Sequence, residues 1–493
     1  MNMRYNPSLY EINTRVWLRR FDPHKKEFTL ADIPSGYWNK FAEDRFDYLW
    51  LMGLWKTSKS VIKKYCFEED LVKNYKHALK DWSPEDVIGS PFAVAEYNVD
   101  PLIGNKRTLL ELKSLLNKKG IRLILDFVPN HFSAQNELLL TNSGIFLSVD
   151  KKYYEEDPHT FYRPFEDKEI YFAHGRDPFF PAWQDTVQVN FFSREAREYL
   201  TNTLLGLVKI CDGVRCDMAM LALNNVFQNT WGGVLSNNGF EKPFDEFWKT
   251  AIDAVKKERA DFIFIAEAYW DLEWDLQQLG FDYTYDKRLT DRLKFSTPES
   301  INEHLSAEIE YQKKSLRFIE NHDEERAILM GKDKSKAAAV VISTIPGLRF
   351  YNDGQFDGKK IKLPVQLGRE PEETVVAGMP EFYKTLLKII SQDIFKKGRW
   401  ELLKPEISWE NNFTFKNMLA WKWNLNNEWR VVVINYSDSV STCRLKLDVR
   451  GFPEEFVLQD LLNNKSYTRS AEEIYHSGLY VELKPFQAHI FAF

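Results

Sequence analysis

Gly213-Val214-Arg215-Cys216-Asp217 ends an apolar, strand-like run on an acidic residue, and three further stretches of the chain follow the same pattern. They are Leu123-Ile124-Leu125-Asp126, which leads on to Asn130-His131, then Phe262-Ile263-Phe264-Ile265-Ala266-Glu267, and last Phe318-Ile319-Glu320-Asn321-His322-Asp323. One carboxylate at the end of a buried strand is common. Four such ends, in one order and widely spaced, are typical of a (β/α)8 barrel, whose strand ends line one pocket.

Short β-rich runs alternate with amphipathic helical stretches from about residue 9 to about residue 395. The first three predicted strands are residues 9–18, 48–54 and 122–128, and residues 108–119 and 193–210 are predicted helices. Steady alternation of strand and helix favours parallel βαβ units. We therefore expect an α/β fold whose catalytic unit is a (β/α)8 TIM barrel, formed by residues 1–131 and 190–397.

Two segments depart from this alternation. Residues 132–189 far exceed the roughly 2–6 residues of an ordinary βα loop, which predicts a small inserted subdomain after the third strand. Beyond that, short β-like runs separated by turn signals occur at residues 431–436, 442–447, 456–458, 479–483 and 489–493. Residues 398–493 are therefore predicted to form a C-terminal all-β sandwich, which could bind carbohydrate or brace the barrel.

The composition of the 493 residues, 44% apolar and 28% charged, is that of an ordinary soluble globular protein. A net charge of −6 without a dense basic stripe argues against a nucleic-acid partner. The chain has no run of about 18 apolar residues, so no membrane span is expected, and its first seven residues lack the apolar core of a signal peptide. The four cysteines show no metal-ligand spacing, which favours a reduced, cytoplasmic protein. The sequence leaves the oligomeric state open.

The acidic strand ends have the residue types that cleave a glycosidic bond. Side chains at i and i+2 of a strand share a face, so Arg215 and Asp217 lie together, and the guanidinium favours the ionised carboxylate that a nucleophile needs. Glu267 ends an apolar run, where burial can raise its pKa and suit it to general acid catalysis. A purely structural Arg–Asp pair and an ordinary loop glutamate are the alternatives.

Asp323 supplies a third carboxylate, which could bind sugar hydroxyls and favour a distorted ring. His322 and His131 could donate hydrogen bonds to the same sugar. For Asp126, Asn130 and His131, a metal cluster or plain strand-end capping remains open.

Aromatic residues make up 15% of the chain. The candidates for shaping the pocket or stacking on sugar faces are Tyr162, Phe179, Phe180, Trp183, Trp231, Trp270 and Trp274. The composition favours a place in the aromatic core for each of them over a sugar-stacking role.

Taken in order, the four stretches resemble the four short regions of the α-amylase superfamily of retaining α-glycosidases. The resemblance implies that Asp217 is the nucleophile, Glu267 the acid/base and Asp323 the stabiliser of the transition state. It also implies a domain inserted after the third barrel strand and a C-terminal β-sandwich. The residues it places in contact with substrate are Asp126, His131, Arg215, His322 and Phe92.

The chain departs from the family pattern at several positions. Members that cleave starch often have Lys-His shortly after the nucleophile, where this chain has the apolar pair Met220-Leu221. The Gly-Tyr before the third strand, whose ring stacks on the reacting sugar, is Pro91-Phe92 here. The Gly-Gln-Glu late in the barrel is Gly354-Gln355-Phe356, without the acidic residue.

The family's common calcium site uses the Asn of the first region and an Asp at the far end of the inserted domain. Asn130 is present, but Gln188 stands where the Asp would fall. A hard cation prefers carboxylate oxygens. We therefore expect no required cofactor and no tight calcium site, with Asn130 as the one candidate metal ligand.

The resemblance implies an oligosaccharide substrate and an α-amylase-like glycoside hydrolase that cleaves α-1,4-linked glucooligosaccharides through a covalent glycosyl-enzyme intermediate. A 4-α-glucanotransferase or other transglycosylase would use the same residues. A non-catalytic scaffold, as in the heavy chains of amino-acid transporters, would be expected to lose carboxylates and carry a membrane anchor. This chain keeps all three acids. The sequence does not fix the sugar, the linkage, or endo or exo action.

Overall fold

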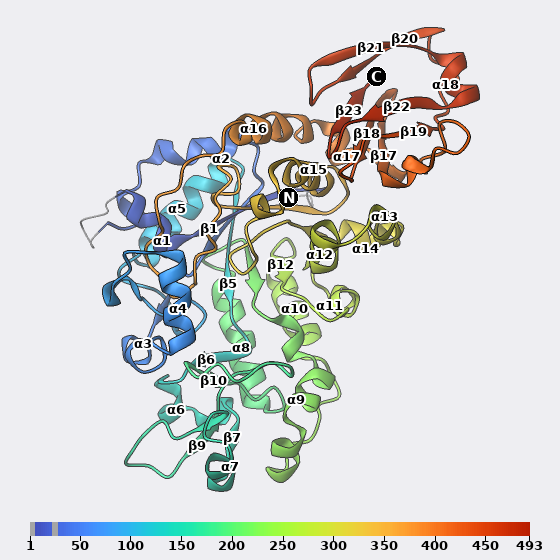
Figure 1. The fold of residues 1–493 in the computed structure, drawn as a ribbon. Coiled ribbons are helices and arrows are strands. Elements are labelled where there is room, and N and C mark those ends of the chain that lie inside the picture. The colour runs from blue at the N-terminus through green and yellow to red at the C-terminus, as the bar shows by residue number, and fades with distance from the viewer. Residues whose placement is uncertain (1–4, 22–27) are drawn as a thin grey trace.

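Eight parallel strands form a closed barrel in the computed structural model, which describes residues 5–21 and 28–493 (Figure 1). They are β1 (Ser8–Asn13), β2 (Tyr48–Met52), β5 (Arg122–Phe127), β11 (Gly213–Cys216), β12 (Ile263–Ala266), β13 (Tyr283–Tyr285), β14 (Ser315–Arg317) and β15 (Leu348–Asn352). They follow one another around the barrel in chain order, and β15 pairs with β1 to close it. The predicted (β/α)8 barrel is confirmed. Residues 1–4, part of the stretch that argued against a signal peptide, lie outside the described residues.

Helices occupy the connections between the barrel strands. In chain order they are α1 (Thr14–Trp17) and α2 (Asn39–Glu43) after β1; α3 (Lys59–Tyr65), α4 (Glu69–Ala78) and α5 (Lys106–Lys118) after β2; α8 (Arg194–Leu207) before β11; α9 (Asn224–Asn237) and α10 (Phe247–Glu258) before β12; α11 (Glu273–Gln278) before β13; α12 (Lys287–Phe295), α13 (Pro298–Leu305) and α14 (Ile309–Lys313) before β14; α15 (Lys332–Thr344) before β15; and α16 (Met379–Ile390) and α17 (Asp393–Lys397) after it. Helix α5 illustrates why such a sequence forms a helix. Its N-cap Asn105 accepts two backbone N–H bonds, and Leu109, Leu112 and Leu116 form its buried face.

The first strand is shorter than predicted. We expected it to run through residues 9–18, but β1 ends at Asn13 and the chain continues as α1. Val16, Trp17 and Leu18 are buried all the same, because the helical turns pack them into the core. A short apolar run has no periodicity that separates a strand from a buried helix.

Large apolar side chains fill the inside of the barrel. One buried cluster joins residues from all of these strands except β11, among them Leu9, Trp50, Ile265 and Phe350. Gly213 begins β11 where there is no room for a side chain, because an added Cβ would lie 2.6 Å from the carbonyl oxygen of Ile263. The lumen is therefore a packed core, and the side chains at the strand ends form the floor of the pocket.

A small mixed unit lies between β5 and α8, as the sequence predicted. Strand β6 (His131–Ser133) pairs antiparallel with β10 (Thr186–Gln188), and a three-stranded sheet has the order β7-β9-β8. The remaining elements of this unit are β7 (Ser148–Val149), β8 (Phe161–Tyr162), β9 (Tyr171–Ala173), α6 (Leu138–Thr141) and α7 (Lys151–Glu156). A further hairpin of β3 (Trp55–Thr57) and β4 (Val94–Val99) precedes α5.

The C-terminal part is an all-β domain, as predicted. A six-stranded sheet has the order β16-β17-β18-β23-β20-β21, and β19 pairs with β22. The bounds are β16 (Arg399–Leu402), β17 (Met418–Leu425), β18 (Glu428–Asn435), β19 (Ser441–Leu445), β20 (Glu455–Asp460), β21 (Lys465–Ser470), α18 (Ala471–Ser477), β22 (Leu479–Leu483) and β23 (Ala488–Ala492). The prediction missed β16, β17 and β21. In Figure 1 this domain lies on the opposite side of the barrel from the inserted unit.

The β-domain packs firmly against the barrel. On β17, Leu419, Trp421 and Trp423 belong to the barrel's own core, whereas Met418 and Ala420 face the core of the β-domain. This is the period of two expected for a strand that is buried on both faces. Trp423 Nε1 also donates to the carbonyl of Thr344 at the end of α15, at 2.7 Å. These contacts support the bracing interpretation of the domain.

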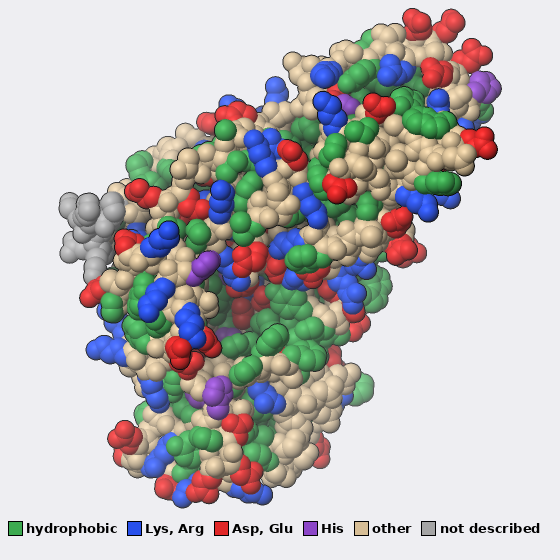
Figure 2. Space-filling model, in the orientation of Figure 1, with side chains coloured by type: hydrophobic (Ala, Val, Ile, Leu, Met, Phe, Trp, Pro, Cys, Tyr) green, Lys and Arg blue, Asp and Glu red, His purple; other side chains and the backbone are tan. Residues whose placement is uncertain are grey.

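Basic and acidic side chains are interspersed over the face shown in Figure 2. Apolar side chains lie between them, without one dominant charged patch in this view. Within residues 5–21 and 28–493, no helix combines the length and apolarity needed to cross a bilayer.

Candidate active site

The polar residues predicted at the strand ends meet at one end of the barrel. Arg215 of β11 lies in register with Asp126 of β5 on one side and with Ile265 of β12 on the other. Glu267 directly follows β12, and its backbone N–H donates to the carbonyl of Cys216. Parallel pairing therefore places the side chains of three different strands around one point.

Arg215 is the centre of the site. Its side chain is 1% exposed; Nη1 lies 2.6 Å from Asp217 Oδ1, and Nη2 lies 2.8 Å from Glu267 Oε2. Its Nε donates to the hydroxyl of Tyr285 at 3.2 Å. The guanidinium carbon also lies 5.2 Å from the ring centroid of Trp50 and 5.4 Å from that of Phe92. One buried cation thus holds both carboxylates in place.

Glu267 is buried and accepts hydrogen bonds at both oxygens. Oε2 accepts from the backbone N–H of Met218 at 2.6 Å, and Oε1 accepts from the Tyr269 hydroxyl at 2.9 Å. Burial raises the pKa of Glu267 to about 7, while the charge of Arg215 opposes the rise. A carboxyl group with this pKa can hold a proton near neutral pH and release it.

Asp217 shares the same surroundings and is 6% exposed. Burial raises its pKa above the ordinary value of 3.8, and the charge and hydrogen bond of Arg215 oppose the rise. The prediction that Arg215 and Asp217 share a face of the strand is confirmed by their 2.6 Å contact.

Asp323 is the most accessible of the three acids, with 44% of its side chain exposed. Its Oδ2 lies 2.9 Å from Nε2 of His322, and Nδ1 of His322 lies 2.5 Å from Oε1 of Glu11. Burial lowers the pKa of His322, but the charges of Asp323 and Glu11 raise it well above the usual value. In turn, the pKa of Asp323 falls to about 2 against the effect of burial, because His322 stabilises the carboxylate.

Sequence reasoning missed Glu11. It lies on β1, fully buried, in the otherwise apolar run Leu9-Tyr10-Glu11-Ile12. A charged residue in a buried strand needs a partner, because an unpaired charge is costly there. That rule was the signal available in the sequence, although it does not name His322 as the partner.

The remaining predicted contact residues surround this centre. The Phe92 ring lies 5.4 Å from that of His322. Asp126 uses both oxygens within the protein, accepting from Trp50 Nε1 at 2.9 Å and from the Gly53 N–H at 2.7 Å, and burial raises its pKa to about 6. His131 is buried and hydrogen-bonds the backbone of Phe92, and burial lowers its pKa to about 3. Asp126 therefore contacts Trp50 on β2 and Gly53 just after that strand, and His131 contacts the loop that carries Phe92.

Residues 91–373 match the model of the alpha amylase catalytic domain, which covers more than half of the chain and includes the three acids. The chain belongs to the α-amylase family. It is thus a member of a family of glycoside hydrolases and related transferases.

Relatives share this organisation at low identity. Alpha-amylase 2 of Dictyoglomus thermophilum is 23% identical over 99% of this chain and 81% of its own length. Alpha-amylase 3 of the same organism is 21% identical over 56% of this chain. That match spans 55% of the relative's own length. Among solved structures, the maltogenic alpha-amylase AmyB from Thermotoga neapolitana superposes with a TM-score of 0.69 at 19% identity, covering 100% of this chain and 99% of that one. The acarbose complex of an alpha-amylase from Geobacillus thermoleovorans gives 0.68 at 16%, covering 99% and 98%.

The calcium position common in the α-amylase family is filled by protein amides in this member. Nε2 of Gln188 donates to Asn130 Oδ1 at 3.0 Å and lies 2.9 Å from the carbonyl oxygen of Asn130. Both side chains are buried. The oxygens that would bind calcium already accept from Gln188. The residues present do not fit the ion.

The other departures from the α-amylase pattern are buried or partly buried. Met220 and Leu221 are 0% and 2% exposed, so they offer no polar group to a sugar. Gln355 Nε2 donates to the hydroxyl of Tyr383 at 2.9 Å, and Phe356 stacks on the same ring at 4.5 Å. The Gln-Phe pair therefore belongs to the packing between β15 and α16.

An aromatic group of the inserted unit meets Trp270, three residues after Glu267 in the chain. Phe179 and Phe180 of the inserted unit are 68% and 67% exposed, and their backbone N–H groups donate to Asp177. The Phe179 ring meets Trp270 edge to face at 4.9 Å. Trp270 and the next residue, Asp271, both have left-handed backbone with φ of 64°.

Proposed function

We propose that this protein is a retaining α-glycosidase that hydrolyses α-1,4-linked glucooligosaccharides through a covalent glycosyl-enzyme intermediate. The observation that carries the proposal is the bridging of Asp217 and Glu267 by one guanidinium, at 2.6 and 2.8 Å. Retaining enzymes hold their two carboxyl groups about 5–5.5 Å apart, whereas inverting enzymes leave about 6.5–9.5 Å for a water. A single bridging Arg215 favours the shorter separation.

In the first step, Glu267 gives its proton to the glycosidic oxygen as Asp217 attacks the anomeric carbon. The bond to the leaving sugar breaks, and an ester forms between the glycosyl group and the Asp217 carboxylate. In the second step, Glu267 takes a proton from water, the water oxygen attacks the anomeric carbon, and the ester bond breaks. Each residue then returns to its starting charge.

The surrounding groups fit these roles. Arg215 favours the ionised form of Asp217 against the effect of burial and stays charged itself at every step. Asp323 and His322 form an ion pair next to the reacting centre that can bind sugar hydroxyls. The Phe92 ring, against His322, offers an apolar face to the reacting sugar.

The relatives support an α-glucan substrate. The Thermotoga neapolitana protein is a maltogenic alpha-amylase, and the Geobacillus thermoleovorans alpha-amylase was solved in complex with acarbose. All four cysteines, Cys66, Cys211, Cys216 and Cys443, are buried and free, which fits a reducing compartment and a cytoplasmic location.

A 4-α-glucanotransferase is the second candidate. It would use the same acids but pass the glycosyl group to a sugar in place of water. The Phe179–Trp270 pair favours it: Phe179 is exposed and Trp270 follows Glu267 by three residues, and an apolar ring surface can hold a sugar acceptor.

The deciding experiment incubates the purified protein with maltoheptaose, separates the products by size and follows their anomeric configuration by NMR. Shorter products that first appear as the α-anomer support retaining hydrolysis, and products longer than the substrate support transfer. Asp217→Asn should abolish both, whereas Asp253→Asn, in the exposed Lys249–Asp253 pair, should change neither. If the folded protein gave no product, or first the β-anomer, the proposal would fall.

A further inference from the structure

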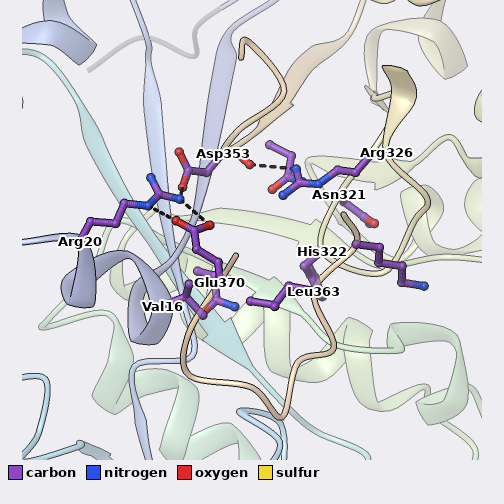
Figure 3. A pocket seen from close by; sticks show the side chains of 11 residues that line it. Val16, Arg20, Asn321, His322, Arg326, Asp353, Leu363 and Glu370 are labelled. Atoms are coloured by element: carbon purple, nitrogen blue, oxygen red, sulfur yellow. Dashed lines mark hydrogen bonds and ion pairs between the residues drawn. The ribbon is translucent and has the colours of Figure 1, made fainter. Parts of the chain in front are cut away.

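The small hollow beside His322 belongs to the catalytic site. Figure 3 shows Arg20 there, turned toward Asp353 and Glu370, and Arg20 forms an ion pair with each of these acids. His322, on the other side, binds Asp323. A separate set of side chains that suits a ligand lies on the C-terminal β-domain.

The two sheets of the C-terminal domain lie in layers against the barrel. One face of the six-stranded sheet packs into the barrel core through Trp421 and Trp423 of β17. Its other face, through Met418, packs in the domain's own core with Cys443 of β19 and Val481 of β22. The β19–β22 sheet is therefore the outer layer, and its outward face is turned away from the barrel. Side chains on this outward face do not brace the barrel.

Cross-strand pairing brings polar and aromatic side chains together on the outward face. Arg444 of β19 pairs with Tyr480 of β22, and on its other side Arg444 pairs with Glu406. Thr442 of β19 pairs with Glu482 of β22 in the same way. The residues between them along each strand point into the core, because the side chains of a strand alternate. Residues directly opposite each other in antiparallel strands share a face, so these five side chains lie together on the outside.

Trp409 extends the outward face with an exposed ring. It follows Glu406 by three residues and is 53% exposed. Its ring centroid lies 6.4 Å from that of Tyr480, and the two ring planes are inclined by 34°. The backbone N–H of Asn412 donates to the carbonyl of Trp409 at 3.1 Å, and Nδ2 of Asn412 donates to Oγ1 of Thr442 at 2.9 Å. These bonds fix the loop on β19, so the two rings form one preformed aromatic surface.

Polar groups border the Trp409–Tyr480 ring pair. The hydroxyl of Tyr480 donates to Oε2 of Glu482 at 3.0 Å, and the guanidinium carbon of Arg444 lies 5.6 Å from the centroid of the Tyr480 ring. The carboxylates of Glu406 and Glu482 accept hydrogen bonds, and Arg444 donates them. A ring surface bordered by donors and acceptors suits a sugar, because the C–H face of the sugar packs on the rings while its hydroxyls bind at their edge.

The size and shape of the ring surface favour a curved sugar chain over a protein partner. A large aromatic side chain presents at most about 150–250 Å², so two partly exposed rings offer roughly 200 Å² or less. A stable protein interface buries about 800 Å² on each partner. An α-1,4-linked glucan curves, so the faces of neighbouring glucose units are inclined to each other, as the two rings are by 34°. A flat β-1,4-linked chain lacks this inclination.

We propose that the outward face of the β19–β22 sheet, with Trp409 and Tyr480 at its centre, is a second glucan-binding site that holds a long α-1,4-linked chain away from the catalytic centre. The site goes beyond the proposed function, and only the choice of an α-glucan as its ligand rests on that function. A chain bound here raises the local concentration of glucan near the barrel, since the second binding event on one chain is intramolecular.

Native electrophoresis through gels that contain glycogen measures this binding. All proteins carry Asp217→Asn, so that the glycogen is not degraded, and the retardation across glycogen concentrations gives an apparent Kd. In this background, Trp409→Ala and Tyr480→Ala should each raise the apparent Kd about fivefold or more. The matched control Phe295→Ala removes a ring that is 82% exposed at the end of α12 and should leave the apparent Kd unchanged. Melting temperatures check that each variant is folded.

Each other outcome decides the matter as well. An unchanged apparent Kd in folded Trp409→Ala and Tyr480→Ala proteins would overturn the inference, whatever the protein does to maltoheptaose. Equal retardation by hydroxyethyl cellulose, a soluble β-1,4-glucan, would overturn the choice of an α-glucan. A dimer in sedimentation that Trp409→Ala dissociates would assign the surface to a second copy of the chain and overturn the inference. If the two variants lost glycogen binding but the unaltered protein cleaved no maltoheptaose, the site would stand and the proposed function would fall.

Discussion

Glu11 and His322, 311 positions apart in the sequence, meet at 2.5 Å beneath the catalytic centre. The contact joins the first barrel strand to the loop after the seventh, and it directs the other ring nitrogen of His322 toward Asp323, 2.9 Å away. Burial lowers the pKa of His322, but both flanking carboxylates raise it well above its usual value and so favour the imidazolium. Glu11 therefore acts on the substrate through His322 and is a positioning residue.

Glu11→Gln should reduce kcat/KM by roughly 10- to 100-fold, since a hydrogen bond to a charged group contributes about 1.5–3 kcal/mol. Loss of the Glu11 charge also lowers the pKa of His322. The reduction in kcat/KM relative to the unaltered protein should therefore grow as pH rises. Rates across pH, with NMR titration of the histidines, check both effects. Glu111→Gln, in an exposed pair on α5, is the control and should behave like the unaltered protein. A pH-independent loss in Glu11→Gln would assign Glu11 a structural role only.

The pH dependence of kcat/KM should have a basic limb set by Glu267. Its pKa is raised to about 7, and the first step needs the protonated form, so activity is full below that pH and declines above it. The acid limb belongs to Asp217, whose pKa lies above 3.8 and which must be ionised. Because the two groups interact, the two limbs of the profile report apparent pKa values that belong to the pair and not to either residue alone.

Glu267→Gln should remove the basic limb and lower kcat about 10²- to 10⁴-fold on maltooligosaccharides. On a glycosyl fluoride, whose leaving group needs no proton, the first step should be far less impaired. Glu273 is a matched control, because burial also raises its pKa to about 7 but it lies on α11, outside the contacts of Arg215. If Glu273→Gln removed the basic limb instead, the assignment of Glu267 as the acid would be wrong.

The barrel could be predicted because its signals are local. Each strand is an apolar run, and a polar residue follows within a few positions. The register of parallel strands then brings these polar residues together at one end of the barrel. One strand was not identified: β13 has only the three residues Tyr283–Tyr285. β14, Ser315–Arg317, is equally short, but the stretch of residues 318–323 that follows it was identified. An apolar helix directly follows β1, so the sequence pattern did not reveal that the strand ends at Asn13.

Contacts between distant segments lay beyond sequence reasoning. Arg20 meets Asp353 and Glu370 across more than 300 positions, and no spacing rule links them. The same holds for Glu11 and His322. In contrast, the pairing of Arg215 with Asp217 follows from the two-residue period of a strand. The centre of the site could thus be read from local pattern, whereas the walls of the pocket depend on how the connections fold.

Gln188 gives a direct test of calcium dependence. It donates to both Asn130 oxygens, so neither EDTA nor added calcium should change the melting temperature of the protein. Gln188→Asp replaces that donor by a buried carboxylate facing oxygens, which should lower stability by about 1–3 kcal/mol without metal. It also supplies the missing hard ligand, so calcium should raise the melting temperature of this variant. A marked loss of stability of the unaltered protein in EDTA would contradict the amide arrangement.

Trp270 offers the last prediction, on the balance between hydrolysis and transfer. Two successive left-handed residues, Trp270 and Asp271, cost of order 1–3 kcal/mol each and hold the indole against Phe179, close to Glu267. Strain of this kind persists where the surrounding structure fixes it, often at functional sites. We expect the indole to bind the incoming acceptor sugar.

Trp270→Ala should therefore lower the ratio of transfer to hydrolysis about fivefold, as for the loss of a contact of order 1 kcal/mol. The ratio is measured from the longer and shorter products of maltoheptaose at high substrate concentration. Trp274→Ala is the control, because Trp274 is 45% exposed on α11 and packs near Tyr311, away from Phe179. If the longer and the shorter products fell equally, Trp270 would instead support the catalytic loop. Loss of an acceptor site lowers the longer, transfer products without lowering the shorter, hydrolysis products.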